Sequence, residues 1–247
     1  MSTFSLPEPP ATLPPHYLPA LEHAIAHIDA TFDPLAIVVS GSILRGNPDP
    51  GSDFDIHVLW SLPQRRRIQL RFDGVPAEIF LNPPAWLARY LQDEAQQGRP
   101  LTADMLASGW LIRDRDGQMQ TFIEMARHQL AAGWQVSADT LQRMRYEAAL
   151  LFEDAAEVFV REPYTARLLQ ASAIEAGLRC WFAGQQRFLP RPKQRLAMLA
   201  DAAPKLHALL IEAMQASTDH APAATLALAR ALIGAEGFFC WDSGDQP

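Results

Sequence analysis

The sequence predicts an α+β fold, in which a small mixed β-sheet is followed by an all-helical bundle, and two observations support this. Short apolar runs rich in branched residues alternate with helical patterns over residues 35–118. From about residue 120 onward the apolar patterns have the period of a helix, and no strand pattern returns. We therefore expect two domains, residues 1–119 with the sheet and residues 120–247 with the bundle. The proline-rich residues 1–15 are expected to form an extended arm of the first domain.

The first half of the chain contains the patterns of two helices and five strands. HYLPALEHAIAHIDAT (16–31) carries apolar residues three and four positions apart, and PPAWLARYLQDEAQQ (83–97) is a helix opened by proline. The expected strands are LAIVVSGS (35–42), SDFDIHVLW (52–60), RRIQLRF (66–72), VPAEIFL (75–81) and the start of GWLIRDRDGQ (109–118). Asp73-Gly74 separates the third and fourth strands and is typical of a two-residue hairpin turn.

The second half carries helical periodicity in successive segments. Ser137 has the character of an N-cap for one of these helices. The expected helical segments are 120–134, 137–162, 163–186, 193–203, 204–216 and 221–235. The sequence therefore predicts a helical bundle in this half.

Charge and cysteine content bound the functional classes. The net charge is -7, with 28 acidic against 21 basic residues, so a nucleic-acid partner is not expected. The dense basic cluster Arg65–Arg67 is short, and it suits either a charged strand edge or phosphate contacts. Cys180 and Cys240 lie among apolar neighbours and are expected to be buried free thiols.

The remaining compositional signals concern location. The N-terminal segment has no basic region followed by an apolar one, so we do not expect it to be a signal peptide. No apolar run approaches the roughly 18 residues that a membrane span needs. We expect a cytoplasmic protein without a membrane partner.

Two aspartates on one expected strand are the main chemical signal. Asp53 and Asp55 are two residues apart, so their side chains leave the strand on the same face, whereas Phe54 points to the core. Adjacent carboxylates repel each other, and burial increases the cost. Mg²⁺ compensates this charge well, because it binds hard oxygen ligands and often uses carboxylates together with substrate phosphates.

A third carboxylate lies on a later strand. Glu78 is flanked by Ala77 and Ile79 in the run VPAEIFL. If this strand lies beside the one with the aspartates, Glu78 completes a triad with Asp53 and Asp55. Three carboxylates can hold one or two metal ions and activate an attacking hydroxyl.

A glycine-rich loop precedes the aspartates. Gly41-Ser42 ends the first strand, and backbone N–H groups in such a turn can bind phosphates. Ser42, Arg45 and Ser52 are further donors, and arginine suits a phosphate fork. A loop with phosphate donors followed by a strand with metal ligands is the pattern of a Mg-nucleotide site.

These motifs resemble the polymerase β-like nucleotidyltransferase superfamily. The match consists of Gly41-Ser42, then Ser52-Asp53-Phe54-Asp55-Ile56 on a strand, then an acid on a later strand. It covers residues 35–82 and is most similar to the bacterial branch of aminoglycoside and minimal nucleotidyltransferases. The resemblance implies a mixed-sheet catalytic core, Mg²⁺ on Asp53 and Asp55, and triphosphate contacts from Gly41, Ser42 and Ser52. Glu78 matches the third acid, as metal ligand or general base.

The helical half resembles the C-terminal bundle of the aminoglycoside-modifying branch. The resemblance implies that bundle residues close over nucleotide and acceptor, and Lys193 in the segment LPRPK is the candidate phosphate clamp. A solvated loop lysine is an equal alternative. Dimers occur in that branch, so a homodimer is a further expectation of the resemblance.

The expected reaction is transfer of a nucleoside monophosphate from a Mg-NTP, with ATP as the expected nucleotide, to a hydroxyl of a small-molecule acceptor. Asp53, Asp55 and Glu78 would be catalytic and metal-binding. Gly41, Ser42, Arg45, Ser52 and Lys193 would bind the nucleotide. Two alternatives are an RNA-directed enzyme of the same superfamily and a toxin–antitoxin nucleotidyltransferase that acts on or binds a protein partner. A module that binds NTP without chemistry is a third.

Overall fold

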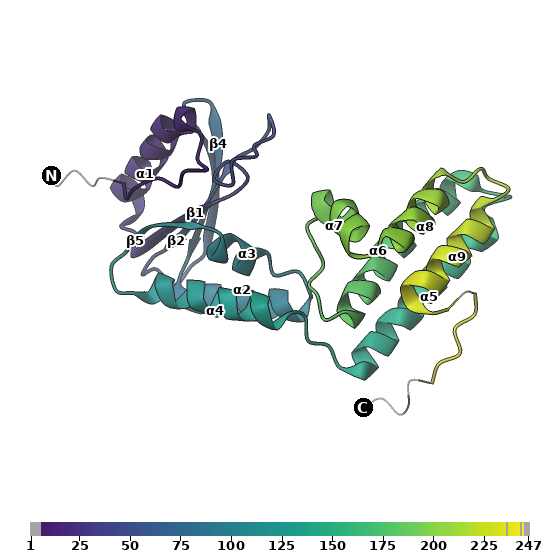
Figure 1. The fold of residues 1–247 in the computed structure, drawn as a ribbon. Coiled ribbons are helices and arrows are strands. Elements are labelled where there is room, and N and C mark those ends of the chain that lie inside the picture. The colour runs from purple at the N-terminus through teal and green to yellow at the C-terminus, as the bar shows by residue number, and fades with distance from the viewer. Residues whose placement is uncertain (1–5, 236, 243, 245–247) are drawn as a thin grey trace. The chain divides into compact units, whose positions relative to one another are not determined.

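The computed structural model (Figure 1) describes residues 6–235, 237–242 and 244, and the chain divides into two compact units, Met1–Ala132 and Gly133–Pro247. The first unit contains a five-stranded sheet in the order β3-β4-β2-β1-β5. Strands β2 and β4 are parallel and the other neighbours are antiparallel. The strands are β1 (Ala36–Ser40), β2 (Phe54–Leu59), β3 (Arg66–Phe72), β4 (Val75–Asn82) and β5 (Trp110–Asp114). The predicted α+β fold with a mixed sheet is confirmed.

Helices cover both faces of this sheet (Figure 1). One face packs its apolar side chains, including Val39, Ile56 and Ile79, against α1. The other face packs Ala36, Val38 and Leu59 against three helices that follow β4 and β5 in the chain. The helical elements of the unit are η1 (Pro15–Tyr17), α1 (Leu18–Phe32), α2 (Pro84–Gln96), α3 (Leu101–Ala107) and α4 (Gln118–Ala132).

The hairpin between β3 and β4 forms as its turn residues predict. Asp73 and Gly74 have φ of 48° and 84°, and positive φ at both central positions is the requirement of a type I′ turn. The turn fixes the register in which Gln69 lies opposite Glu78. This register determines which groups contact the Glu78 carboxylate.

The division between the two units lies later than the sequence suggests. The predicted boundary at residues 119–120 assigns α4 to the bundle, whereas Met119, Ile123 and Ala126 of α4 are buried against the sheet of the first unit. The compact units accordingly divide after Ala132. The apolar stripe of α4 indicates that one face is covered, but its partners are the sheet and the helices α2 and α3 of the first unit and not the bundle.

The N-terminal segment is also more closely packed than an extended arm. Leu13 is buried in the core beneath the sheet, and Thr12 Oγ1 donates a 2.5 Å hydrogen bond to the Leu44 carbonyl. The segment around Thr12 and Leu13 therefore packs against the loop that follows β1 and stabilises it. Residues 1–5 of the predicted arm lie outside the described residues.

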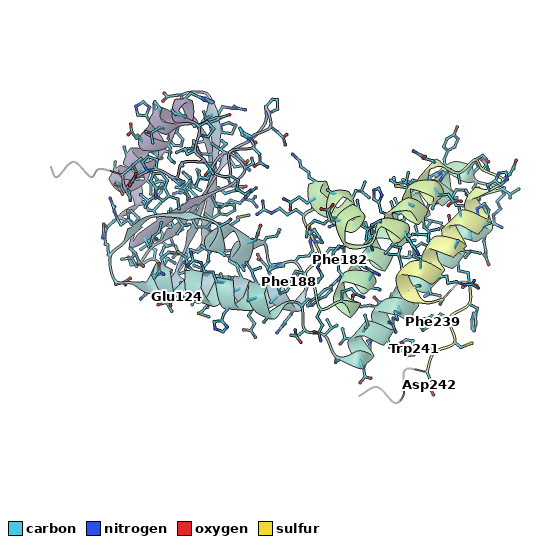
Figure 2. All side chains as sticks on the ribbon, in the orientation of Figure 1. Glu124, Phe182, Phe188, Phe239, Trp241 and Asp242 are labelled. Carbon is cyan, nitrogen blue, oxygen red and sulfur yellow. The ribbon has the colours of Figure 1, made fainter. Side chains whose placement is uncertain are left out.

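The regular elements among the described residues of the second unit are all helices, as predicted. Ser137 caps its first helix, since the Ser137 hydroxyl accepts a 3.1 Å hydrogen bond from the Thr140 amide. Figure 2 labels Phe182 of the core and Trp241, whose ring centroid lies 4.7 Å from that of Tyr146. The elements are α5 (Ala138–Val158), α6 (Pro163–Gly184), η2 (Pro192–Gln194), α7 (Arg195–Ala202), α8 (Pro204–Gln215) and α9 (Ala221–Ile233).

The two cysteines differ from each other. Cys180 on α6 is buried, and burial raises the pKa of its thiol to about 12. Cys240 is exposed, so the prediction of a buried thiol there was wrong, because the segment after α9 leaves that side chain uncovered. No helix in the described part of the chain combines the length and apolar character needed to cross a membrane.

The position of α4 leads to a first prediction. Ile123→Ala removes a side chain that is only 3% exposed, so we expect a loss of about 2–4 kcal/mol in the stability of the first unit. Hydrogen exchange followed by mass spectrometry should show faster exchange in β1 and α3 and no change in α6. Met125→Ala is the matched control, since Met125 on the same helix is 49% exposed and its removal should change little. Faster exchange in α5 and α6 instead would contradict the assignment of α4 to the first unit.

Candidate active site

The candidate site begins with two neighbouring parallel strands. In the register of β2 and β4, Asp55 lies directly beside Glu78. Their chain neighbours Phe54, Ile56 and Ile79 are fully buried against α1, so the alternation of a strand sends both carboxylates to the opposite face. Asp53 immediately precedes β2, and its carboxylate lies near those of Asp55 and Glu78. One carboxylate oxygen from each of the three residues lies within 4.8 Å of the others.

A glycine allows the loop after β1 to approach this cluster. Gly41 has φ of 111°, which side chains with a Cβ rarely adopt. A Cβ at this position would lie 3.0 Å from the Asp53 carbonyl oxygen and 3.3 Å from Asp55 Oδ2. The backbone of the loop therefore borders the carboxylates directly.

The loop is a succession of turns and not a helix N-terminus. Its backbone closes through hydrogen bonds from Gly46 N to Ile43 O and from Asn47 N to Ser42 O, at 3.1 and 3.2 Å. The hydroxyls of Ser42 and Ser52 are 2.6 Å apart, and the Asp49 amide donates to the Ser52 hydroxyl at 2.8 Å. Ser42 and Ser52, ten residues apart in the chain, thus form one polar group beside the Gly41 backbone.

The Glu78 carboxylate is held from the side of the hairpin. Arg67 Nε and Gln69 Nε2 on β3 both donate to Glu78 Oε1, the second at 3.1 Å. The hydrogen bond from Arg67 lowers the pKa of Glu78, and burial opposes this shift without reversing it. No hydrogen bond to Oε2 is found among the described residues, so the two oxygens of Glu78 have different environments.

The carboxylates fit a divalent metal ion. Asp53, Asp55 and Glu78 supply hard oxygen donors, which are the ligands that Mg²⁺ prefers. Since the anchoring bonds of Glu78 use Oε1, Oε2 can serve as a ligand without loss of those bonds. Without a cation, the three carboxylates would lie close together and repel one another, so a bound cation would stabilise the cluster.

A cavity of about 550 Å³ opens beside the carboxylates within the first unit, which is in the size range of small-molecule sites. His57 and Phe80 stack in it, with ring centroids 4.8 Å apart. Burial lowers the pKa of His57 to about 4, so its ring is neutral at pH 7. The lining residues are Asp55, His57, Arg65, Arg66, Arg67, Glu78, Phe80, Asn82, Tyr90, Glu94, Leu101, Thr102 and Met105.

Helices α2 and α3 form the other wall of the cavity. The Glu94 carboxylate of α2 accepts hydrogen bonds from the Thr102 amide at 2.6 Å and from the Thr102 hydroxyl at 2.9 Å, which joins the two helices. Burial raises the pKa of Glu94, and the bonds from Thr102 oppose that shift. The Tyr90 hydroxyl on α2 accepts a hydrogen bond from Nη1 of Arg65, the residue that precedes β3.

The structure thus brings together most of the residues that the sequence singles out. Asp53, Asp55 and Glu78 converge, and Gly41, Ser42 and Ser52 border them. Arg45 is exposed in the same loop. Lys193 is exposed on η2 of the second unit, so its part in nucleotide binding stays a prediction.

Other residues of the site were not predicted. Arg67 and Gln69 contact Glu78 because β3 pairs antiparallel with β4, and the hairpin signal at Asp73-Gly74 already contains this information. Glu94 and Thr102 meet only through the packing of α2 on α3, for which the sequence offers no local signal. In the second unit, the exposed Glu175 forms an ion pair with the buried Arg195.

Comparisons with known proteins show the fold alone. No family model and no curated protein matches the chain. A solved structure described as a nucleotidyltransferase-like protein from Exiguobacterium sibiricum 255-15 is similar, with a TM-score of 0.54 and 14% sequence identity. The match covers 87% of this chain and 73% of that one. The chain therefore has a nucleotidyltransferase-like fold with an Asp-Asp-Glu cluster that can bind a metal ion.

The close approach at Gly41 predicts the effect of a side chain there. Gly41→Ala should displace the loop or Asp55 and weaken Mn²⁺ binding at least about tenfold, as measured by isothermal titration calorimetry. Gly74→Ala is the matched control, because Gly74 also has positive φ but a Cβ added there would meet nothing within 4 Å. Both variants should lose stability, and only Gly41→Ala should lose metal affinity. Equal Mn²⁺ affinity in both would contradict the contact of this loop with the metal site.

The buried histidine predicts a pH dependence of stability. The folded-state pKa of His57 is about 4, against an ordinary value of 6.5, so the unfolded chain binds the proton first as the pH falls. The first unit should therefore lose about 2 kcal/mol of unfolding free energy between pH 7 and pH 5 through this residue. Urea unfolding at both pH values should show a smaller loss for His57→Phe, which keeps a ring against Phe80. An unchanged pH dependence in that variant would exclude His57 as its source.

Proposed function

We propose that the protein is a metal-dependent nucleotidyltransferase that transfers a nucleoside monophosphate from an NTP, with ATP as the preferred donor, to a hydroxyl of a small molecule. The observation that carries this proposal is the convergence of Asp53, Asp55 and Glu78 beside the Gly41 turn, in a nucleotidyltransferase-like fold. An unrelated acidic cluster would not need a glycine-bordered loop with paired serine hydroxyls at its edge. Phosphates and a cation make use of both features.

In this proposal the loop binds the triphosphate. The backbone at Gly41 and the hydroxyls of Ser42 and Ser52 donate to phosphate oxygens, and Arg45 on the same loop adds positive charge. Lys193 of the second unit is a further candidate for the triphosphate. These donors stabilise the negative charge that collects on the leaving pyrophosphate.

The carboxylates would hold one or two Mg²⁺ ions, through Asp53, Asp55 and Oε2 of Glu78. Such ions would neutralise charge on the phosphoryl oxygens and would lower the pKa of a hydroxyl bound to them. Because the hydrogen bond from Arg67 lowers the pKa of Glu78, we assign Glu78 to binding and orientation and not to general-base catalysis.

The transfer itself is an in-line displacement. The acceptor oxygen forms a bond to the α-phosphorus, the bond from that phosphorus to the bridging oxygen breaks, and pyrophosphate leaves with the electron pair. The hydroxyl proton passes to solvent.

Cys180 and Cys240 are free thiols, which agrees with a reducing, cytoplasmic location.

The decisive experiment is a screen of Mg-NTPs with small hydroxylated acceptors, followed by pyrophosphate release. Asp55→Asn should lower transfer about a thousandfold or more, since it removes a ligand from the metal site, while circular dichroism shows a folded protein. Asp73→Asn is the matched control, because it makes the same carboxylate-to-amide change in the hairpin turn, where asparagine tolerates the positive φ of 48°. Full activity of Asp55→Asn would overturn the metal assignment.

A further inference from the structure

The register of the strands arranges the site along one axis. Ser40 and Asp55 are opposite each other, so the loop after β1 lies at the level where β2 begins. The cavity extends the other way, past His57 and Phe80 to Asn82 at the end of β4. The triad therefore lies between the loop that suits phosphates and the cavity.

The position of Arg65 follows from the same register. Arg66 is opposite Leu81, so Arg65, one residue earlier on an antiparallel strand, lies at the level of Asn82. Asn82 is four residues beyond Glu78, a distance on the order of 13 Å along a strand. Arg65 thus stands at the end of the cavity that is remote from the triad.

The cavity offers little to a cationic ligand. The carboxylates that line it are Asp55 and Glu78, which belong to the triad, and Glu94. Both oxygens of Glu94 accept hydrogen bonds from Thr102. Glu94 is therefore the one carboxylate among these three outside the triad, and an amino group on an acceptor would compete with the Thr102 bonds for it.

Arg65 offers a site for an anion. Its guanidinium carbon lies 4.9 Å from the Trp86 ring centroid and 6.0 Å from that of Tyr90, and its Nη1 donates to the Tyr90 hydroxyl. In the described part of the chain no carboxylate forms an ion pair with Arg65, whereas Arg89 over the same Trp86 ring pairs with Asp93 at 3.2 Å. Stacking on aromatic rings fixes a guanidinium and leaves its other N–H groups for a ligand.

The neighbouring arginines of β3 have other contacts. Arg67 donates to Glu78, and its guanidinium carbon lies 5.1 Å from the Phe80 ring centroid. The Arg66 guanidinium lies 5.6 Å from the ring centroid of Phe32, which belongs to the α1 side of the sheet. Arg65 and Arg66 are thus the lining arginines without an ion pair among the described residues, and Arg65 is the one whose guanidinium lies against α2.

We infer that the cavity is the acceptor site and that it selects a small hydroxylated molecule that carries an anionic group, a phosphate or a carboxylate, bound by Arg65. This inference rests on the proposed function. It names an anionic acceptor class, in contrast to the polycationic aminoglycosides of the branch that the sequence resembles. Asn82, whose side chain lines the cavity near Arg65, can bond a hydroxyl of the same molecule.

Matched acceptors test the inference on the full chain. The probes are a neutral hexose, its 6-phosphate, its uronic acid and its 2-amino form, each with Mg-ATP, and the readout is pyrophosphate release. At least one anionic probe should have a kcat/KM about tenfold or more above that of the neutral hexose, and the amino form should have no advantage. Preference for the amino form would overturn the inference.

Variants then locate the selectivity. Arg65→Gln should lower kcat/KM for the anionic probe about 10- to 100-fold, mainly through KM for the acceptor, with KM for ATP unchanged. Arg65→Lys should restore part of the loss, because it keeps the charge but not the planar fork. Arg127→Gln is the control, since Arg127 is an exposed arginine on α4 that does not line the cavity. A rise in KM for ATP in Arg65→Gln would place the nucleotide in the cavity and overturn the inference.

A binding measurement separates this inference from the proposed function. Titration of the hexose 6-phosphate and the uronic acid without ATP should show binding by the wild type that Arg65→Gln loses. If no NTP reacts but this binding persists, the proposed function fails and the anion site stands. If transfer occurs with no dependence on the anionic group or on Arg65, the proposed function stands and the inference fails. Absence of binding by both anionic probes, or transfer only to a short RNA with a free 3′-hydroxyl, also overturns it.

Discussion

The parallel pairing of β2 with β4 is the constraint on which the candidate site depends. It places Asp55 beside Glu78, and a shift of one residue would send one of these carboxylates into the apolar core against α1. The buried side chains oppose such a shift, since a shift of β2 would move Phe54 and Ile56 to the polar face and a shift of β4 would move Ile79 there. The same hydrophobic burial that stabilises the sheet therefore holds together charges that repel each other.

The hairpin supports this arrangement from the outer side. Because β3 pairs antiparallel with β4, Arg67 and Gln69 reach Glu78, and their hydrogen bonds reduce the cost of its burial. Both bonds use the same oxygen of Glu78. An anchored oxygen and an oxygen without a hydrogen bond from the described residues suit a ligand that must keep its position when a cation binds.

Local sequence patterns predict the elements and the triad, but not the cavity. The alternation of apolar and polar residues around Asp53, Asp55 and Glu78 predicts the face on which each side chain lies. The convergence of the three carboxylates follows once β2 and β4 are neighbours. The contact of Arg65 with Tyr90 and that of Glu94 with Thr102 depend on how α2 and α3 pack, which no short segment encodes. For the same reason the apolar stripe of α4 predicts a helix without identifying the sheet and the two helices of the first unit against which it packs.

The separation of Arg65 from the triad has an electrostatic consequence for an anionic acceptor. Two unit charges 4 Å apart repel by about 4 kcal/mol at an effective dielectric constant of about 20, and this falls to about 1 kcal/mol at about 13 Å. An anion bound near the triad would oppose both the carboxylates and the incoming triphosphate. An anion at Arg65 meets a guanidinium that no described carboxylate balances, while the hydroxyl at the other end of the molecule can reach the triad. The distance along β4 thus allows one cavity to bind a negative group and to present an uncharged nucleophile to a negative phosphate.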